Sequence, residues 1–176
     1  MKMRMTCNTD QKVGVKMPRI VIIYDSVTGN TELMAKAVLE GANAVKGVDV
    51  ECHKVGTRFP TGAINEASAI ILGSPTEYGN ITQHMRAFLE SITELQTAKK
   101  LRLRGMIGGV FGSYAYDGGW VVDSLAMRMK SLGVKLVPLV VSAADNEGSM
   151  GIHIDQKALD KCRELGGAVA RKIMNQ

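Results

Sequence analysis

RIVIIYDSVTGNTELMAKAV, residues 19–38, runs from an apolar segment through a cluster of small polar residues into a helical pattern. The apolar segment Ile20–Tyr24 has the length and composition of a strand that is buried on both faces. From Asn30 to about Lys46, apolar residues recur at helical spacing. We therefore predict a strand, a tight polar turn and a helix, which is the repeating unit of a parallel α/β sheet.

The same alternation continues along the rest of the chain. Further strands are predicted at Val48–Lys54, Ala69–Gly73, Met106–Gly112 and Val134–Val141, and further helices at Ile81–Leu95, Val121–Leu132 and Asp155–Ile173. The connection between the second and third strands is too short for a long helix. This order predicts parallel strands joined by right-handed crossovers, with helices on both faces of the sheet. Alternating polarity places the second strand at an edge, and Pro138 indicates that the last strand lies at an edge or is bent.

Length and composition indicate one folded domain. The 176 residues are 45% hydrophobic, and no apolar run approaches the roughly 18 residues that a membrane span needs, so we expect no membrane association. Residues 1–17 lack periodicity and are expected to form a basic tail, with the domain at residues 18–176. Three widely spaced cysteines suit the reducing cytoplasm, and the histidines lack the spacing of metal ligands.

The formal charge of +5 raises the question of nucleic-acid binding. The tail carries four cations against Asp10, a net +3, which leaves only +2 for residues 18–176. Cations at residues 99–104 follow a predicted helix, where they interact favourably with the helix end, and no aromatic residues alternate with them. We therefore expect no nucleic-acid partner. Cys52 and Arg58 have the Cys-x5-Arg spacing of a phosphatase loop, but they lack its glycine-rich turn and following helix.

Hydroxyl and amide side chains crowd the first strand-to-helix turn. Ser26, Thr28, Asn30 and Thr31 offer donors beside the free N–H groups of a helix start, and Gly29 allows a tight turn. This combination predicts an anion cup that holds a phosphate without a cation. The lysine of a nucleotide-hydrolysing loop and the GxGxxG dinucleotide fingerprint are both missing. Simple capping of the helix would need only one such residue.

Two more loops follow buried strands on the same predicted edge of the sheet. GSPTEYGN, residues 73–80, contains Tyr78, and FGSYAYDGGW, residues 111–120, contains Tyr114 and Tyr116. Four of the eight aromatic residues of the chain lie in or next to these two loops, a concentration that a flat conjugated ligand would explain. Trp120 is expected to pack as part of the following helix rather than to contact a ligand.

The segments YDSVTGNTE, ILGSPTEYGN and VFGSYAYDGG resemble the three FMN-binding loops of the flavodoxin family. The similarity is closest to the flavodoxin-like domain of A-type flavoproteins (flavodiiron proteins), and it covers about residues 19–173. It implies a doubly wound three-layer α/β/α sandwich with a five-stranded parallel sheet in the order 2-1-3-4-5. Relatives carry Trp in the third loop where this chain has Tyr116.

The resemblance also implies FMN as the cofactor, with its phosphate in the first loop and its ring between the second and third. The implied cofactor-binding residues are Ser26, Val27, Thr28, Gly29, Asn30, Thr31, Pro75, Thr76, Glu77, Tyr78, Gly79, Asn80, Ser113, Tyr114, Tyr116, Asp117 and Gly118. No catalytic or metal-binding residues are implied, because the diiron ligand set is missing.

An electron-transfer protein that shuttles electrons through flavin semiquinone and hydroquinone is the function that the resemblance implies. Its partners would be redox proteins, ferredoxin-like or a separate oxidoreductase, with the chain a monomer or a homodimer in the cytoplasm. The alternative is an NAD(P)H-dependent FMN oxidoreductase of the quinone or flavin reductase type. A third possibility, a regulatory domain without flavin, predicts a colourless protein that ignores FMN.

Overall fold

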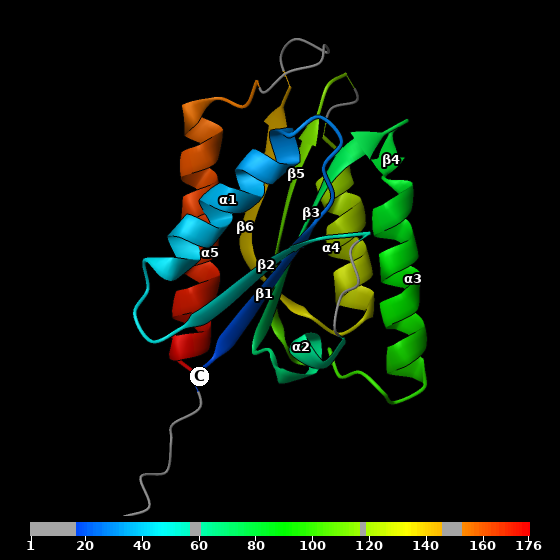
Figure 1. Ribbon diagram of the computed structural model, residues 1–176, viewed down its shortest axis with the longest axis vertical. Helices are drawn as coiled ribbons and strands as arrows, with labels where there is room; N and C mark the ends of the chain where they lie inside the picture. The colour runs from blue at the N-terminus through cyan, green and yellow to red at the C-terminus, as the bar shows by residue number, and fades with distance from the viewer. Residues whose placement is uncertain (1–16, 57–60, 117–118, 146–152) are drawn as a thin grey trace, which may run out of the picture.

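The computed structural model describes residues 17–56, 61–116, 119–145 and 153–176, and these form a three-layer α/β/α sandwich (Figure 1). The strands are β1 (Arg19–Tyr24), β2 (Asp49–Lys54), β3 (Ala69–Glu77), β4 (Asn80–Ile81), β5 (Ile107–Tyr114) and β6 (Lys135–Ala144). The helices are α1 (Asn30–Asn43), α2 (Thr61–Glu66), α3 (Gln83–Thr97), α4 (Val121–Ser131) and α5 (Gln156–Met174).

Five parallel strands make up the main sheet in the order β2-β1-β3-β5-β6. This confirms the predicted order, with the edge strands β2 and β6 where they were expected. The register of β6 against β5 shifts between Gly108 and Val110, opposite the part of β6 that contains Pro138. Pro138 has no backbone N–H to donate to β5, and the missing hydrogen bond explains the shift.

Each buried strand divides its side chains between two cores, as the two-residue period of a strand requires. In β1, Ile20 and Ile22 pack into the core under α1 and α5, whereas Val21 and Ile23 pack into the core under α3 and α4. β3 repeats the division with Ile71 on the first face and its neighbours on the second. A sheet buried on both faces explains the continuous apolar runs in the sequence.

Two short elements interrupt the regular alternation. The connection between β2 and β3 contains the six-residue helix α2, whose Ile64 is buried against the sheet. The two-residue strand β4 pairs antiparallel with the end of β3, through Thr76 with Ile81 and Glu77 with Asn80. Neither element was predicted, because both are too short to show a period in the sequence.

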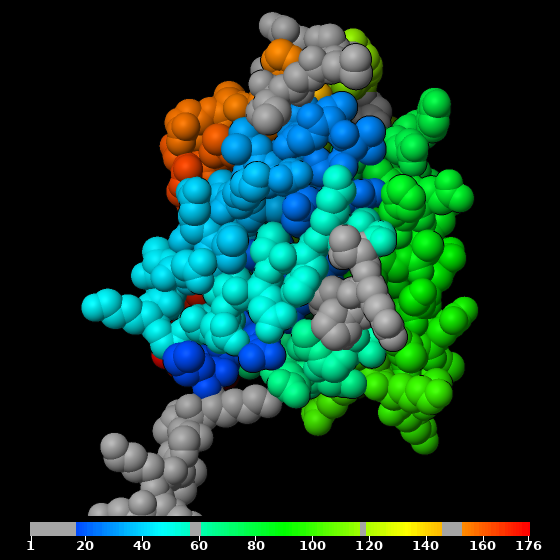
Figure 2. Space-filling view, in the orientation of Figure 1, coloured from blue at the N-terminus to red at the C-terminus, as the bar shows by residue number. Residues whose placement is uncertain are grey.

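Helices α1 and α5 cover one face of the sheet, and α3 and α4 cover the other (Figure 1). In the space-filling view, α1 (blue to cyan) and β2 (teal) cover most of the visible face, and α3 (green) forms its right-hand margin (Figure 2). None of the helices in the described ranges is long and apolar enough to cross a bilayer.

Two free thiols, the half-buried Cys52 and the buried Cys162, provide a pH-dependent test of this packing. Burial raises the pKa of Cys52 to about 11 and that of Cys162 to about 12. A free thiol ionises near pH 8.5, so folding keeps both groups neutral, and this contribution to stability is present below about pH 8.5 and lost as the pH rises toward 11–12. A Cys52 that resists ionisation also argues against a phosphatase nucleophile; Arg58 of that alternative lies outside the described residues.

In a Cys7→Ser variant at pH 8, we expect iodoacetamide to alkylate the folded protein about 100-fold more slowly than the same protein in urea, because only the thiolate reacts. Mass spectrometry of timed samples measures the rates. Rapid single labelling of the native protein at Cys52 would contradict the partial burial of this side chain on β2.

Candidate functional site

The first loop, residues 25–29, leads from the end of β1 into α1. Gly29 caps the helix with φ at 100°, a left-handed conformation that glycine adopts without strain. The hydroxyl oxygen of Ser26 accepts the backbone N–H groups of Gly29 and Glu32, each at 3.2 Å. The loop therefore wraps around the hydroxyl of Ser26 at a helix N-terminus, where backbone N–H groups and the helix dipole favour an anion.

Asp25, which the sequence did not single out, anchors this loop to the second one. Its carboxylate is buried and accepts the backbone N–H of Ser26 at 2.8 Å and the hydroxyl of Thr82 at 2.6 Å. Nδ1 of His84 lies 3.6 Å from the same carboxylate. Thr82 in turn caps α3 by accepting the N–H of Met85 at 3.2 Å. One carboxylate thus joins the start of the first loop to the start of α3.

The second loop is a hairpin made by the end of β3 and by β4. Its two-residue turn consists of Tyr78 and Gly79, with φ of 50° and 74°. Positive φ at both central residues is the geometry of a type I′ hairpin turn, in which Asn and Gly are usual and an aromatic residue is strained. The side chain of Tyr78 is fully exposed at the hairpin tip, so the pairing of β3 with β4 holds the turn and packing of this side chain does not.

The third loop follows β5 and lies beside the first. The hydroxyls of Ser113 and Thr31 are 2.8 Å apart, and the hydroxyl of Thr76 donates to the carbonyl of Ser113 at 3.3 Å. Ser113 therefore contacts both other loops. Tyr116 is exposed, whereas Asp117 and Gly118 lie outside the described residues.

Trp120 is a correction to the prediction, because it does not pack as part of the following helix. It immediately precedes α4, and 70% of its surface is exposed. The next two residues, Val121 and Val122, turn inward and supply the packing that was expected of the indole.

A cavity of about 370 Å³ opens where the three loops meet, within the size range of small-ligand sites. Its lining consists of Val27, Thr28, Pro75, Thr76, Glu77, Tyr78, Ser113, Tyr114, Ala115 and Asp145. Eight of these ten residues are among those predicted from the sequence. The structure therefore brings the three predicted loops together around one cavity at the carboxyl ends of the strands.

Asn30 and Thr31, although predicted as site residues, point their side chains inward. The amide of Asn30 donates to Thr28 Oγ1 at 3.0 Å and to Asp145 Oδ2 at 2.7 Å, and its carbonyl oxygen accepts the N–H of His153 at 2.8 Å. Asn30 thus ties the first loop to both ends of the segment that follows β6. Asp145 was missed because the last strand was predicted to end at Val141, whereas β6 runs to Ala144 and places Asp145 at the carboxyl end of the sheet, where ligands bind in such folds.

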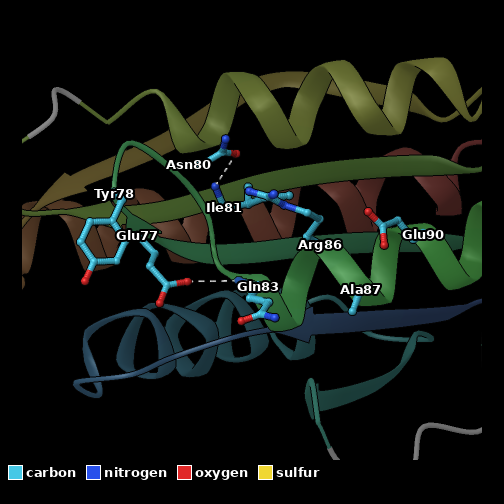
Figure 3. A pocket seen from close by; sticks show the side chains of 8 residues that line it. All are labelled: Glu77, Tyr78, Asn80, Ile81, Gln83, Arg86, Ala87 and Glu90. Carbon is cyan, nitrogen blue, oxygen red and sulfur yellow. Dashed lines mark hydrogen bonds between the residues drawn. The ribbon is translucent and has the colours of Figure 1, made fainter.

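A second cavity, of about 510 Å³, lies on the α3 side of the hairpin (Figure 3). It shares Glu77 and Tyr78 with the first cavity, so the hairpin is a wall between the two. Figure 3 shows Tyr78 at the hairpin tip, away from Arg86 and Glu90 on α3, and Glu77 accepting the N–H of Gln83 at 3.1 Å. This hydrogen bond fixes the base of the hairpin to α3.

The comparisons with known proteins agree with this geometry. The flavodoxin family model matches residues 22–166. The chain belongs to the flavodoxin family. FMN is the cofactor of flavodoxins and therefore of this domain, and electron transfer is their function. Within the described ranges, no group of three or more His, Cys, Asp or Glu residues could hold a metal ion.

Two curated relatives match this chain over only part of their own length. The NAD(P)H dehydrogenase (quinone) of Acidithiobacillus ferrooxidans is 34% identical over 122 residues, which cover 58% of this chain and 60% of that protein. The anaerobic nitric oxide reductase flavorubredoxin of Pectobacterium carotovorum is 29% identical over 158 residues, which cover 88% of this chain and 28% of that protein. The flavodoxin domain described here thus spans less than two thirds of either relative.

Solved structures confirm the fold. A flavodoxin from the domain Archaea has a TM-score of 0.75 and 27% identity, covering 89% of this chain and 99% of that one. The flavodiiron core Flv1 of Synechocystis sp. PCC6803 has a TM-score of 0.74 and 22% identity, covering 92% of this chain and 37% of that one. The flavodoxin fold is therefore common to a free-standing protein and to part of a larger one.

Proposed function

We propose that this flavodoxin domain carries electrons one at a time between redox partner proteins, by means of FMN held in the cavity where the three loops meet. The observation that carries the proposal is the junction of a hydroxyl-bearing helix start with two tyrosine-bearing loops around a cavity of about 370 Å³. FMN supplies the chemistry, since its ring accepts and releases single electrons. The protein binds and orients it.

The residues fit the phosphate end of FMN. The hydroxyl of Ser26 already accepts two backbone N–H groups, so its own proton is available to donate to a phosphate oxygen. The first turn of α1 adds the positive end of the helix dipole. A hydrogen bond to a charged oxygen contributes about 1.5–3 kcal/mol. Together they hold the dianion without a cation.

The residues also fit the ring. Tyr78 and Tyr116 are exposed on the second and third loops, where their side chains are free to cover a flat ligand and to shield it from water. The remaining cofactor-binding residues of the proposal are Val27, Thr28, Gly29, Asn30, Thr31, Pro75, Thr76, Glu77, Gly79, Asn80, Ser113, Tyr114, Asp117 and Gly118. The domain extends over residues 18–176 in this proposal, and residues 1–17 are a tail outside it.

FMN binding tests this function directly. We expect FMN-free protein to quench the fluorescence of one equivalent of FMN at micromolar concentrations, and Ser26→Ala to weaken FMN about tenfold with little change for riboflavin, which lacks the phosphate. Ser91→Ala is the matched control, because that hydroxyl is exposed on α3 and bonds only the carbonyl of Ala87. A protein that takes up no flavin, or a Ser26→Ala variant that loses both ligands equally, would contradict the proposed phosphate site.

A second candidate function rests on the relative named as a quinone dehydrogenase, which is the more identical of the two curated relatives reported. If this chain oxidised NAD(P)H itself, the purified FMN-loaded protein would consume NADPH in the presence of a quinone without any other protein. For a carrier, we expect no NADPH consumption until a reductase is added. Absorbance at the nicotinamide band distinguishes the two.

A further inference from the structure

We propose that Asp145 is a specificity-determining residue of the flavin site, which accepts a hydroxyl of the sugar-alcohol chain of FMN through its Oδ1 oxygen. The inference rests on the proposed function and adds to it a residue in none of the three sequence loops. Asp145 directly follows β6 and lines the same cavity as Thr28 and Ser113.

Two hydrogen bonds fix the position of Asp145. Its backbone N–H donates to the carbonyl of Tyr114 at 2.6 Å, which ties it to the third loop. Its Oδ2 oxygen accepts the amide of Asn30 at 2.7 Å, which ties it to the first loop. The carboxylate is therefore held between the loop assigned to the phosphate and a loop assigned to the ring. The chain of FMN joins those two parts of the cofactor.

The other carboxylate oxygen, Oδ1, has no partner. Of the buried side-chain nitrogen and oxygen atoms in the described ranges, it is the one without a hydrogen bond. A carboxylate oxygen removed from water without a donor is costly, and buried acceptors in folded proteins are almost always satisfied. Since the residue lines a ligand cavity, a donor that arrives with the ligand satisfies it.

The charge of Asp145 decides which part of FMN that donor belongs to. At neutral pH the phosphate of FMN carries a charge of about −1.5 to −2 and would be repelled by the carboxylate. The neutral donors that FMN offers are the hydroxyls of its chain and the N3–H group of its ring. The hydroxyls belong to the part of FMN that joins the ring to the phosphate, as Asp145 joins the loops assigned to them. Asp145 therefore selects flavins with a hydroxylated chain and keeps the phosphate toward the first loop.

Three flavins separate this role from the alternatives: FMN, riboflavin, which lacks the phosphate, and lumiflavin, which lacks the whole chain. We expect Asp145→Ala to raise the dissociation constants of FMN and riboflavin about tenfold or more and to leave that of lumiflavin within twofold. Asp145→Asn keeps the size and one acceptor oxygen, so a smaller loss for FMN and riboflavin is expected. Fluorescence quenching or, for weak ligands, calorimetry gives the constants.

Asp155→Asn is the matched control. Asp155 caps α5 by accepting the N–H of Ala158 at 2.7 Å, is exposed, and does not line this cavity. Since asparagine is an equally good cap, this variant removes one negative charge without disturbing the helix. The dissociation constants of FMN, riboflavin and lumiflavin should all stay unchanged.

Two results would overturn the assignment. If Asp145→Asn bound FMN more tightly and riboflavin with an unchanged dissociation constant, the carboxylate would act only as a charge that repels the phosphate. Equal weakening of all three flavins by both Asp145 variants would mean that Asp145 holds the loops together or bonds the ring, and not the chain. Failure of the unmodified protein to bind any flavin is a different outcome, which refutes the proposed function itself.

Discussion

Replacing Gly166 by alanine is expected to lower the free energy of unfolding by about 3 kcal/mol, although alanine is the better helix former by about 1 kcal/mol. A Cβ atom at Gly166 of α5 would lie 2.0 Å from the carbonyl oxygen of Val38 and 2.8 Å from the backbone nitrogen of Ala42, both in α1. The contacted atoms are backbone and cannot rotate away. The two helices would have to separate along their whole contact.

The neighbouring residue provides a matched control. A Cβ atom at Gly167 would meet first the end of the Arg171 side chain, at 2.9 Å, which is flexible and can move aside. Gly167→Ala should therefore change the free energy of unfolding by less than about 1 kcal/mol. Urea unfolding of the FMN-free proteins gives both values, and at 2–4 °C per kcal/mol the first variant should melt about 6–12 °C lower. Similar losses in the two variants would refute the close α1–α5 contact.

This contact illustrates which parts of the fold could be predicted. The apolar periods of α1 and α5 and their places in the β/α alternation are visible in the sequence, because burial on one face requires them. That the two helices approach closely enough to need glycine at Gly41 and Gly166 is not visible, since glycine inside a helical pattern has several possible causes. The distance of a Cβ at Gly41 from the carbonyl oxygen of Arg163, 1.9 Å, supplies the cause.

The candidate site, too, could be predicted in part from the sequence. Its three loops could be predicted, because clusters of hydroxyls, glycines and tyrosines follow three apolar strands that must end at one edge of a parallel sheet. Asn30 was grouped with ligand-binding residues because it stands at the helix start and matches an FMN-binding loop, but the sequence did not reveal that its side chain links Thr28, Asp145 and His153. Two of these three contacts join residues 115 and 123 positions apart, and no local pattern in the sequence encodes such contacts.

Substituting Asp25 by alanine is the second change with a large expected effect, a loss of about 3–5 kcal/mol in the free energy of unfolding of the FMN-free protein. The carboxylate accepts two hydrogen bonds, from Ser26 and Thr82, each contributing about 1.5–3 kcal/mol because the acceptor is charged. Both donors are buried and would be left without a partner. Asp123→Ala is the control, since that carboxylate is exposed in the first turn of α4 and contributes at most about 1 kcal/mol.

The same variant should bind FMN at least tenfold more weakly, because Asp25 sets the spacing between the loop that carries Ser26 and the helix start that carries Thr82. Thr82→Ser, which keeps the hydroxyl that donates to Asp25 and accepts from Met85, should retain most of both stability and affinity. Urea unfolding and FMN fluorescence quenching on one set of variants provide the comparison. If Asp25→Ala unfolded at the same urea concentration as Asp123→Ala and bound FMN equally well, the two loops would be positioned independently of this carboxylate. Two hydrogen bonds of the hairpin, from the hydroxyl of Thr76 to the carbonyl of Ser113 and from the N–H of Gln83 to Glu77, would then have to account for the shape of the cavity.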